Sequence, residues 1–289
     1  MKEIKEKAYA KINISLDVTG RRDDGYHDMA MVMQTVSLCD DIRISENDSG
    51  MIRAYSSLRF IPGDDRNLAV KAAKQFLEYT GESTNGLRID IKKNIPVGAG
   101  MGGGSSDAAA VLRAMNRLFG RKLSREELSE LASHVGSDTA FCISGGTALA
   151  AGRGEILTEL PAFPDCFFVI CKPDFSISTP ELFRKIDTVT LHVHPDTQGI
   201  ITALQKGELS EICRRMYNVF EDLDDRRLRT VGEIKSRLLD FGALGAVMTG
   251  TGSAVFGIYD SEEAADAAAA ALGKEYRFCF RAVPKGKIL

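Results

Sequence analysis

Several absences limit what this 289-residue chain can be. It has no basic excess, because 37 Lys and Arg stand against 40 Asp and Glu, so the composition gives no reason to expect a nucleic-acid partner. No segment approaches the roughly 20 consecutive apolar residues that a membrane-spanning helix needs, so we expect no membrane segment. Tryptophan is missing altogether, and the six cysteines never form a C-x-x-C pair.

The cysteines are too scattered for a metal site or a disulfide framework. They occupy positions 39, 142, 166, 171, 213 and 279, mostly within apolar segments. We therefore expect reduced thiols in the interior of a cytosolic protein. The first seven residues alternate in charge and lack the apolar core of a signal peptide, which also favours a cytoplasmic enzyme.

What the sequence does contain is a glycine-rich segment near its centre. Five of the seven residues from 98 to 104 are glycine, which leaves the backbone free to adopt positive φ and its amides unshielded. An alanine-rich run follows and predicts a helix whose N-cap is Ser105 or Ser106. Unpaired N–H groups and the positive end of the helix dipole converge at such a junction. The pattern therefore predicts a phosphate-binding loop.

Two common phosphate loops do not fit this segment. A P-loop requires Gly-x-x-x-x-Gly-Lys-Ser/Thr, and although Gly98 and Gly103 match, the lysine position is Gly104. The dinucleotide pattern G-x-G-x-x-G is matched by Gly98, Gly100 and Gly103. However, a second helix, opened by a capping box over 124–127, follows where that fold requires a strand. A loop that binds nothing is disfavoured, because five glycines cost conformational entropy.

Strand and helix patterns alternate along the whole chain. Period-two alternation or short apolar runs predict strands over 10–18, 41–45, 51–55, 87–91, 145–150, 166–171 and 276–283, and a strand–loop–strand segment over 245–257. Helical spacing and end signals predict helices over 67–79, from the glycine loop to 120, over 124–136, 179–186, 224–241 and 261–272, and two more within 197–220. Prolines at 161 and 164 indicate a junction between two domains.

Two polar positions are candidates for catalysis. Lys11 and Asn13 share one face of the strand over 10–18, where they either line a site or form a solvated polar face. Asp138 lies between a helix end and an apolar segment, where it is either a catalytic carboxylate or a further helix cap.

Three histidines raise separate questions. His27 follows Tyr26 directly after a charged turn; both are either structural or exposed, or their rings stack on and hydrogen-bond a nucleobase. His192 and His194 could form a metal pair, but no third ligand is apparent nearby in the sequence. An exposed polar patch is the favoured interpretation of that pair.

The segment 95–109 resembles the phosphate loop of the GHMP small-molecule kinases. The residues at 10–13, the Gly-Tyr-His tripeptide at 25–27 and the segment 249–253 are similar to further motifs of one branch of this family, in the same order. These matches run from residue 8 to about 260, and the chain length also agrees. The sequence departs from the family pattern at Thr139-Ala140, where a Val-Pro-like pair is expected after Asp138.

The resemblance implies an α+β fold of two domains with the site in the cleft between them. The expected N-terminal domain, over 1–160, is like domain 2 of ribosomal protein S5, and the expected C-terminal domain, over 161–289, is ferredoxin-like. The implied reaction is ATP-dependent phosphorylation of the 2-hydroxyl of 4-diphosphocytidyl-2-C-methyl-D-erythritol, giving the 2-phosphate and ADP, in the non-mevalonate (MEP) pathway of isoprenoid biosynthesis. The implied cofactors are ATP and Mg²⁺, without a nucleic-acid or membrane partner. We expect a cytoplasmic monomer or weak homodimer.

The same resemblance assigns roles to individual residues. Asp138 becomes the general base that accepts the hydroxyl proton, and Lys11 becomes its electrostatic partner, which suits a reaction that depends on positioning and charge neutralisation. The implied ATP-binding residues are Pro96, Val97, Gly98, Ala99, Gly100, Met101, Gly102, Gly103, Gly104, Ser105 and Ser106. The implied substrate-binding residues are Asn13, Tyr26, His27, Asp138, Phe183, Thr251 and Gly252. Protein ligands for Mg²⁺ are unknown, with Ser105 or Ser106 as candidates.

Two other functions stay open at this point. One is a kinase of the same superfamily for another alcohol, such as homoserine or mevalonate; the tripeptide at 25–27 argues against it, because those substrates have no base to stack. The other is a non-catalytic nucleotide-binding or sugar-sensing module. The presence of both Lys11 and Asp138 argues against that module.

Overall fold

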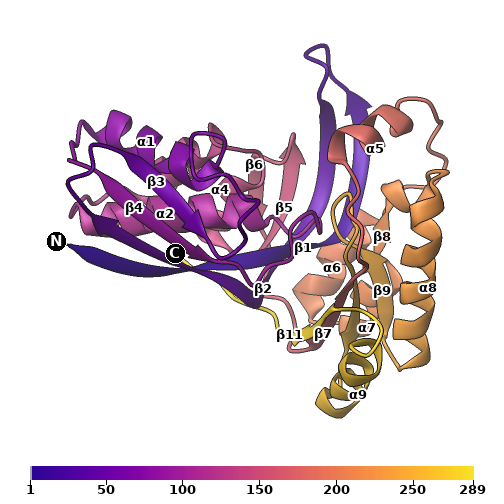
Figure 1. Cartoon of the computed structure of the whole chain (residues 1–289). Coiled ribbons are helices and arrows are strands. Elements are labelled where there is room, and N and C mark those ends of the chain that lie inside the picture. Colours follow the sequence, from indigo (N-terminus) through magenta and orange to yellow (C-terminus); the bar gives the residue numbers. More distant parts are fainter. Residues whose placement is uncertain (1) are drawn as a thin grey trace.

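The computed structural model describes residues 2–289, which form two β-sheets with helices packed against them (Figure 1). The strands are β1 (Glu3–Arg21), β2 (His27–Glu46), β3 (Ile52–Ser56), β4 (Leu87–Lys92), β5 (Thr147–Gly152), β6 (Ile156–Glu159), β7 (Phe167–Lys172), β8 (Tyr217–Asn218), β9 (Gly245–Met248), β10 (Val255–Tyr259) and β11 (Phe278–Ala282). The helices are α1 (Leu68–Thr80), α2 (Gly103–Leu118), α3 (Arg125–Ser133), α4 (Thr139–Ser144), α5 (Thr179–Ile186), α6 (Thr197–Lys206), α7 (Leu209–Arg214), α8 (Arg226–Asp240) and α9 (Glu262–Leu272), with a 3₁₀ turn, η1, at Val219–Asp222. No helix among them is both long enough and apolar enough to span a membrane.

The larger sheet is built on a long antiparallel hairpin of β1 and β2. It has the order β3-β4-β2-β1-β8, and β5 and β6 extend it from β2. Figure 1 shows the hairpin crossing the molecule and ending in a tip beside α5. The prediction of a separate strand over 41–45 is wrong, because β2 is continuous over 20 residues. One half of β2 pairs with β5 and the other with β4, so the strand changes neighbours without a turn.

Most of the predicted helices are confirmed, together with their end signals. Asn67 caps α1 through a bond from the Ala69 amide, and Gly81 ends this helix in the left-handed region. The capping box at the start of α3 is present in full. The two helices predicted within 197–220 are α6 and α7, but the second ends at Arg214, and β8 and η1 occupy the rest.

The predicted N-cap of the loop helix is wrong. Helix α2 begins at Gly103, and its N-cap is Gly102 at φ 68°, rather than Ser105 or Ser106. A glycine is favoured at this position for two reasons. Its backbone is left-handed, which other residues rarely adopt, and a Cβ there would lie only 3.1 Å from Cγ of Lys11. The serines therefore fall inside the first turn of the helix.

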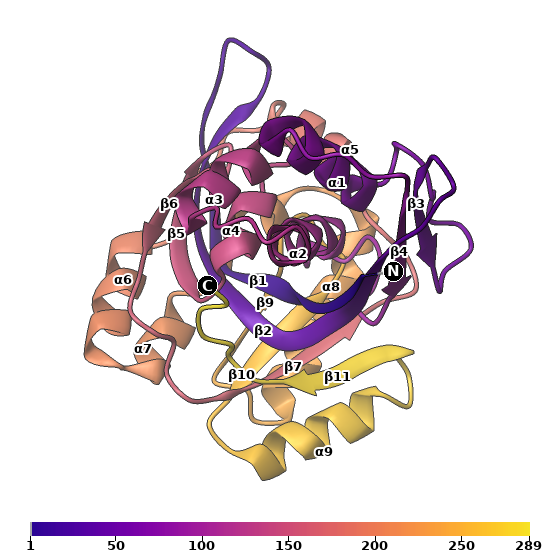
Figure 2. The same ribbon diagram turned by 90° about the vertical axis from the view of Figure 1, so that its left-hand side faces the viewer.

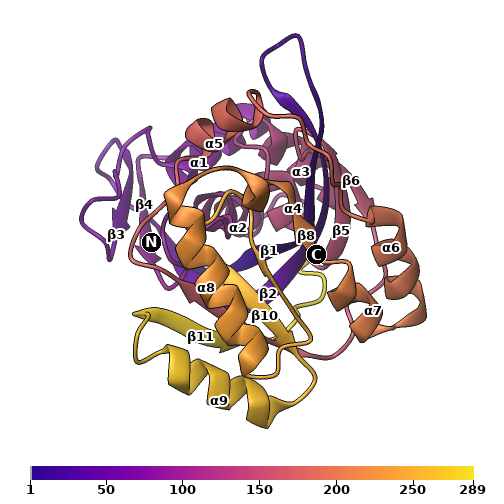
Figure 3. The ribbon, with the colours of Figure 1, turned by 90° about the vertical axis from the view of Figure 1, so that its right-hand side faces the viewer.

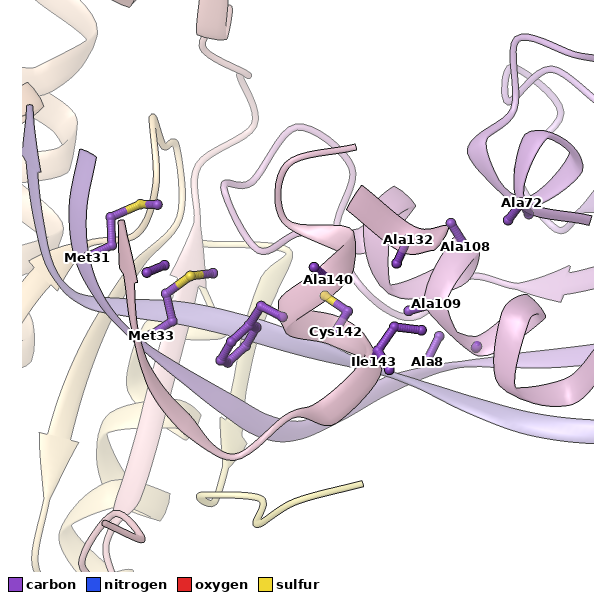
Figure 4. Close-up of a cluster of buried hydrophobic side chains, with 14 of the residues drawn as sticks. Ala8, Met31, Met33, Ala72, Ala108, Ala109, Ala132, Ala140, Cys142 and Ile143 are labelled. Carbon is purple, nitrogen blue, oxygen red and sulfur yellow. The ribbon is translucent and has the colours of Figure 1, made fainter. Parts of the chain in front are cut away.

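Helices α1 to α4 cover one face of the larger sheet, and small side chains let them approach it closely. Figure 2 shows α2 end-on, with α1 on one side and α3 and α4 on the other. Figure 4 shows Ala109 of α2 and Ile143 of α4 near Ala8 of the hairpin, and Ala108 of α2 beside Ala132 of α3. Met31 and Met33 of β2 extend the same cluster. These side chains are buried, so the helix that carries the glycine loop is fixed on the hairpin.

The smaller sheet has the order β11-β7-β10-β9 and is entirely antiparallel. Its strands and the helices α8 and α9 follow the β-α-β-β-α-β sequence of a ferredoxin-like fold, as the resemblance implied. Alternate residues of β7 face opposite ways: Phe168 and Ile170 enter a cluster with α6, α7 and the hairpin, whereas Val169 enters the cluster with α8 and α9. Figure 3 shows α8 and α9 next to this sheet. Burial on both faces explains why this strand reads as a continuous apolar run.

The two halves of the chain are interlocked. The short strand β8 from the second half pairs in parallel with β1, with Ser15 opposite Tyr217. The last residues return to the larger sheet through bridges between Val36 and Pro284 and between Gly145 and Lys287. The division at 160/161 stays a prediction, and the contacts across it place residues of both halves around one cavity.

Candidate active site

A cavity of about 720 Å³ opens between the hairpin tip, the glycine loop and α5. This volume is within the range of small-molecule sites. The predicted site residues that line it are Lys11, Tyr26, His27, Gly100, Gly102, Ser105, Asp138, Phe183 and Thr251. The structure therefore brings together groups from both halves of the chain, from Lys11 to Thr251.

A buried lysine and a carboxylate face each other at this cavity. Nζ of Lys11 lies 3.3 Å from Oδ2 of Asp138 and donates a hydrogen bond of 2.7 Å to Oδ1 of Asn13. The side chain of Lys11 is 5% exposed, and that of Asp138 is 30% exposed. The alternative of a solvated polar face on this strand is thus wrong, because Lys11 and Asn13 are both buried. The carboxylate remains accessible from the cavity.

Irregularities in the hairpin direct these side chains. The register of β1 against β2 shifts between Tyr9 and Lys11 and again between Asn13 and Ser15. Bulges of this kind are frequent beside active sites because they re-aim side chains. The backbone amide of Lys11 also bonds the carbonyl of Met101 at 3.1 Å, which joins this strand to the glycine loop.

Asp138 is the residue before α4, but its side chain makes no capping hydrogen bond. The structure therefore contradicts the alternative that this carboxylate serves as a helix cap. Helix α4 begins at Thr139, so the Thr-Ala pair that departs from the family pattern forms its first residues. A Cβ on Gly154 would lie 3.7 Å from Oδ1 of Asp138, so a glycine also lies close to this carboxylate.

The glycine loop separates the first cavity from a second one of about 380 Å³. The residues of the predicted ATP loop that line the second cavity are Pro96, Val97, Gly98, Ala99, Gly100, Met101, Gly102, Gly103 and Gly104. The segment Phe60–Pro62 and the N-cap residue Asn67 line it too. Because Gly100 and Gly102 line both cavities, a molecule that lies in the second can reach the first across the loop.

The third motif, at 249–253, packs directly against the glycine loop. The hydroxyl of Thr249 accepts a bond from the amide of Asn13 at 3.0 Å and donates to the carbonyl of Gly100 at 3.2 Å. A Cβ on Gly100, which has φ 74°, would overlap the carbonyl oxygen of Thr249. Only glycine permits this approach, so the loop and the motif form one rigid wall.

A buried asparagine that the sequence patterns did not reveal supports this wall. Nδ2 of Asn218 donates to the carbonyls of Met248 and Gly250, at 2.8 Å each. The hydroxyls of Thr251 and Thr179 lie 2.7 Å apart, which links the motif to α5. No local signal marks Asn218, because its partners are about 30 residues away and its own strand has only two residues.

Aromatic rings line the end of the cavity next to the hairpin tip. The ring centroids of His27 and Phe183 are 4.8 Å apart, and Nε2 of His27 lies 2.7 Å from Oδ1 of Asp187. Tyr26 is 55% exposed, and the guanidinium of Arg153 lies 5.2 Å from its ring centroid. This end of the cavity thus offers flat apolar surfaces and hydrogen-bonding groups together.

Some predicted residues do not reach the cavity. Asn13 acts behind Lys11, and Gly252 is not part of the lining. The hydroxyl of Ser106 is buried and donates to the carbonyl of Tyr9 at 2.7 Å. His194 is exposed, and its Nδ1 lies 2.8 Å from Oδ1 of Asp17. Among residues 2–289 no group of three or more His, Cys, Asp or Glu side chains that could hold a metal is found.

A buried charge network lies beneath the glycine loop. The ammonium of Lys93 contacts the carboxylates of Asp40 and Asp107, and Asp40 also accepts the amide of Ile95 at 2.8 Å. A Cβ on Gly103 would lie 3.3 Å from Nζ of Lys93. Burial raises the pKa of Asp107 to about 8, although the Lys93 ammonium 2.7 Å away acts in the opposite direction. The network connects β2, the segment before the loop and the N-terminal part of α2.

Sequence analysis also missed the cations at the cavity. Arg21, Arg153 and Arg184 line it, as does Asp187. Arginine is common on protein surfaces, and none of these residues belongs to a recognisable motif. Only the fold reveals that they surround the same space.

Comparisons with known proteins agree with this geometry. Residues 67–146 match the model of the GHMP kinases N terminal domain, and residues 200–277 match that of the GHMP kinases C terminal domain. A homoserine kinase from Cytophaga hutchinsonii has a TM-score of 0.76 with 21% identity, covering 99% of this chain and 96% of that one, which demonstrates a shared fold.

More similar relatives narrow the family. Proteins described as 4-diphosphocytidyl-2-C-methyl-D-erythritol kinase are 44% identical in Clostridium botulinum, over 88% of this chain and 90% of the relative, and 46% identical in Bacillus velezensis, over 90% and 89%. A crystal structure described as 4-(cytidine 5'-diphospho)-2C-methyl-D-erythritol kinase has a TM-score of 0.82 and 32% identity, and covers 98% of this chain and 100% of that one. The chain therefore belongs to the GHMP kinases, and within them to the family of the 4-diphosphocytidyl-2-C-methyl-D-erythritol kinases.

Proposed function

We propose that this chain transfers the γ-phosphoryl group of ATP to the 2-hydroxyl of 4-diphosphocytidyl-2-C-methyl-D-erythritol, in the non-mevalonate pathway. The observation that carries the proposal is the Lys11–Asp138 pair, 3.3 Å apart, beside the glycine loop and in one cavity with His27 and Phe183. The glycine loop thus suits the phosphoryl donor, the Lys11–Asp138 pair suits the acceptor hydroxyl, and the aromatic residues suit a nucleobase.

Asp138 serves as the general base. Its carboxylate is open to the cavity and is free of a capping bond, so it can accept the proton of the substrate hydroxyl. Lys11 holds this carboxylate in place and offsets the negative charge of the transferring phosphoryl group. Asn13 fixes the Lys11 ammonium from behind through its amide oxygen.

The rest of the cavity suits a nucleoside diphosphate ester. The cytosine ring stacks on the aromatic faces of Tyr26 and Phe183, which supply affinity, and its edge lies towards His27. Arg21, Arg153 and Arg184 offer cationic groups for the diphosphate that joins cytidine to methylerythritol. The methylerythritol then lies towards Asp138.

ATP occupies the second cavity, with its phosphates on the amides of the glycine loop and the start of α2. The residues present fit a magnesium ion only in part. Ser105 is the favoured ligand, because it lines the first cavity beside the glycine loop, whereas the Ser106 hydroxyl is occupied by the carbonyl of Tyr9. When bound, Mg²⁺ would neutralise charge on the phosphates and leave most of its coordination to phosphate and water oxygens.

A kinase for homoserine or mevalonate is the second candidate, because proteins with those names share the fold at 21% and 19% identity. The aromatic end of the cavity disfavours it, since neither small alcohol would fill that space. The non-catalytic module is disfavoured by the accessible Asp138 carboxylate beside a buried lysine.

The product identifies the reaction. With Mg-ATP and the cytidyl substrate, ³¹P NMR should show a new phosphate monoester together with ADP, while the diphosphate resonances of the substrate persist. Formation of inorganic phosphate alone, without a new monoester, would contradict the proposal.

A further inference from the structure

The carboxylate of Asp187 holds the ring of His27 at the wall of the cavity. Nε2 of His27 lies 2.7 Å from Oδ1 of Asp187, and Oδ2 of the same carboxylate lies 3.6 Å from Nη1 of Arg21. Asp187 follows the last residue of α5, and His27 is the first residue of β2. The contact therefore ties α5 to the hairpin tip, which stand side by side in Figures 1 and 3.

The histidine ring is fixed by packing as well as by this bond. The side chain of His27 is 7% exposed. Phe183 lies against its ring at 4.8 Å, and Phe220 packs edge-on against Phe183 at 5.0 Å. The ring is thus held in one orientation. Which of its two nitrogens carries the hydrogen then decides whether the ring presents a hydrogen-bond donor or an acceptor to a ligand.

The carboxylate determines that identity. An ionised carboxylate only accepts hydrogen bonds, so the hydrogen of a neutral His27 ring is on Nε2. The other nitrogen, Nδ1, then carries a lone pair and acts as an acceptor. Among residues 2–289, the only side-chain hydrogen bond of the ring is the one to Asp187, so Nδ1 is available.

We propose that Asp187 is a positioning residue that fixes the His27 tautomer and so makes the site select cytosine over uracil. Cytosine has an amino group at position 4, a donor, where uracil has a carbonyl, an acceptor. An acceptor at Nδ1 pairs with the amino group and opposes the carbonyl. The selection of cytosine over uracil rests on the proposed function, whereas the position of the hydrogen on the His27 ring is independent of it.

The kinetic test is Asp187→Asn, assayed at pH 8 with the cytidyl substrate and its uridine counterpart. Asparagine has the same shape, but its amide can offer Nε2 either a donor or an acceptor, so both tautomers become available. We expect the ratio of kcat/KM for cytidyl over uridyl substrate to fall at least about tenfold, through KM for the cytidyl substrate. The kcat and the KM for ATP should stay within about twofold, since a single hydrogen bond to the base is affected.

A second histidine–aspartate pair supplies a matched control. Nδ1 of His194 lies 2.8 Å from Oδ1 of Asp17, and neither residue lines the cavity. Asp17→Asn loosens the same kind of contact on the same hairpin, and we expect the cytidyl preference to be unchanged. An equal loss of preference in Asp17→Asn would assign the effect to general loosening and would overturn the proposal.

The tautomer is read directly by ¹⁵N NMR of the histidine rings in the substrate-free protein, with His27→Gln used to assign the signal. We expect Nε2–H in the wild type and a mixture in Asp187→Asn. A wild-type ring that carries Nδ1–H, or an Asp187→Asn variant with full cytidyl preference, would overturn the proposal. Inactivity of the wild type towards the cytidyl substrate would instead overturn the proposed function, while the ring signal would still decide the role of Asp187.

Discussion

The ammonium nitrogen of Lys11 lies 3.3 Å from Oδ2 of Asp138, although one residue is in the first strand and the other precedes the fourth helix. The lysine is buried and the carboxylate is open to the cavity, so the pair presents a positioned carboxylate to a ligand. This asymmetry is what a phosphoryl-transfer site requires, because such reactions depend on positioning and on neutralised charge.

Replacement of the carboxylate separates chemistry from binding. Asp138→Asn should lower kcat by roughly 10²–10⁴-fold, the usual contribution of a general base, while the dissociation constant of ATP changes little. Steady-state kinetics and a nucleotide-binding titration measure the two effects. The matched control is Asp165→Asn, an exposed carboxylate outside the cavity lining. A kcat near the wild-type value in Asp138→Asn would remove this residue as the base.

The glycine loop should tolerate no side chain at its contact with the third motif. Gly100→Ala places a methyl group against the Thr249 carbonyl and also forces alanine into a left-handed backbone, which costs roughly 1–2 kcal/mol. Gly120→Ala has the same kind of backbone, with φ 64°, but no atom within 4 Å of the new Cβ. Overpacking typically adds about 1–3 kcal/mol, so the free energy of unfolding should fall further in Gly100→Ala by that amount. Equal losses in the two variants, measured by denaturant unfolding, would show that the contact yields easily.

The two serines of the loop helix should have separable roles. Ser105→Ala should raise the Mg²⁺ concentration that gives half-maximal activity, because this side chain faces the cavity. Ser106→Ala should lower the melting temperature, since it removes a buried bond to Tyr9, and should leave the Mg²⁺ dependence unaltered. Magnesium titrations and thermal unfolding of both variants check this pattern. A reversal between the two serines would assign the metal to Ser106.

Stability should depend on pH through Asp107. Its pKa is raised to about 8 by burial, from an ordinary value of 3.8, so the folded protein retains a proton that the unfolded chain releases. The free energy of unfolding contributed by this group therefore falls as the pH rises from about 4 to about 8, with a slope of up to about 1.4 kcal/mol per pH unit.

Asp107→Asn should flatten this slope, because an amide does not titrate. Denaturant unfolding of the wild type and of the variant between pH 5 and pH 8 measures the difference. Parallel pH profiles of the two proteins would contradict the role of Asp107 in the network with Lys93 and Asp40.

Features with local causes could be predicted from the sequence. The capping box of α3 and the glycine that ends α1 depend on residues close together in the chain, and both are confirmed. The strand predicted over 10–18 is confirmed as part of β1, but its polar residues are buried as well as its apolar ones. The α+β class and the ferredoxin-like order follow from the sequence of such elements and from the family resemblance.

Features with distant causes could not be predicted. The N-cap of α2 is Gly102 and not a serine. Lys11, which belongs to the distant strand β1, packs so closely against this position that a side chain there would be crowded. Asn218 and Asp187 carry no local signal, because their partners are brought to them by the fold. Sequence motifs thus indicated the expected chemistry, whereas the residues that hold the site in place could be identified only from the structure.

The most direct test of the proposed function compares acceptor substrates under one set of conditions. ADP release is measured with Mg-ATP and 4-diphosphocytidyl-2-C-methyl-D-erythritol, mevalonate or homoserine, with the Asp138→Asn variant as the background. We predict that kcat/KM for the cytidyl substrate exceeds that for either small alcohol by orders of magnitude, because only that substrate reaches both Asp138 and the His27–Phe183 wall. ADP release that the cytidyl substrate does not stimulate, or that mevalonate or homoserine stimulates equally, would contradict the proposal.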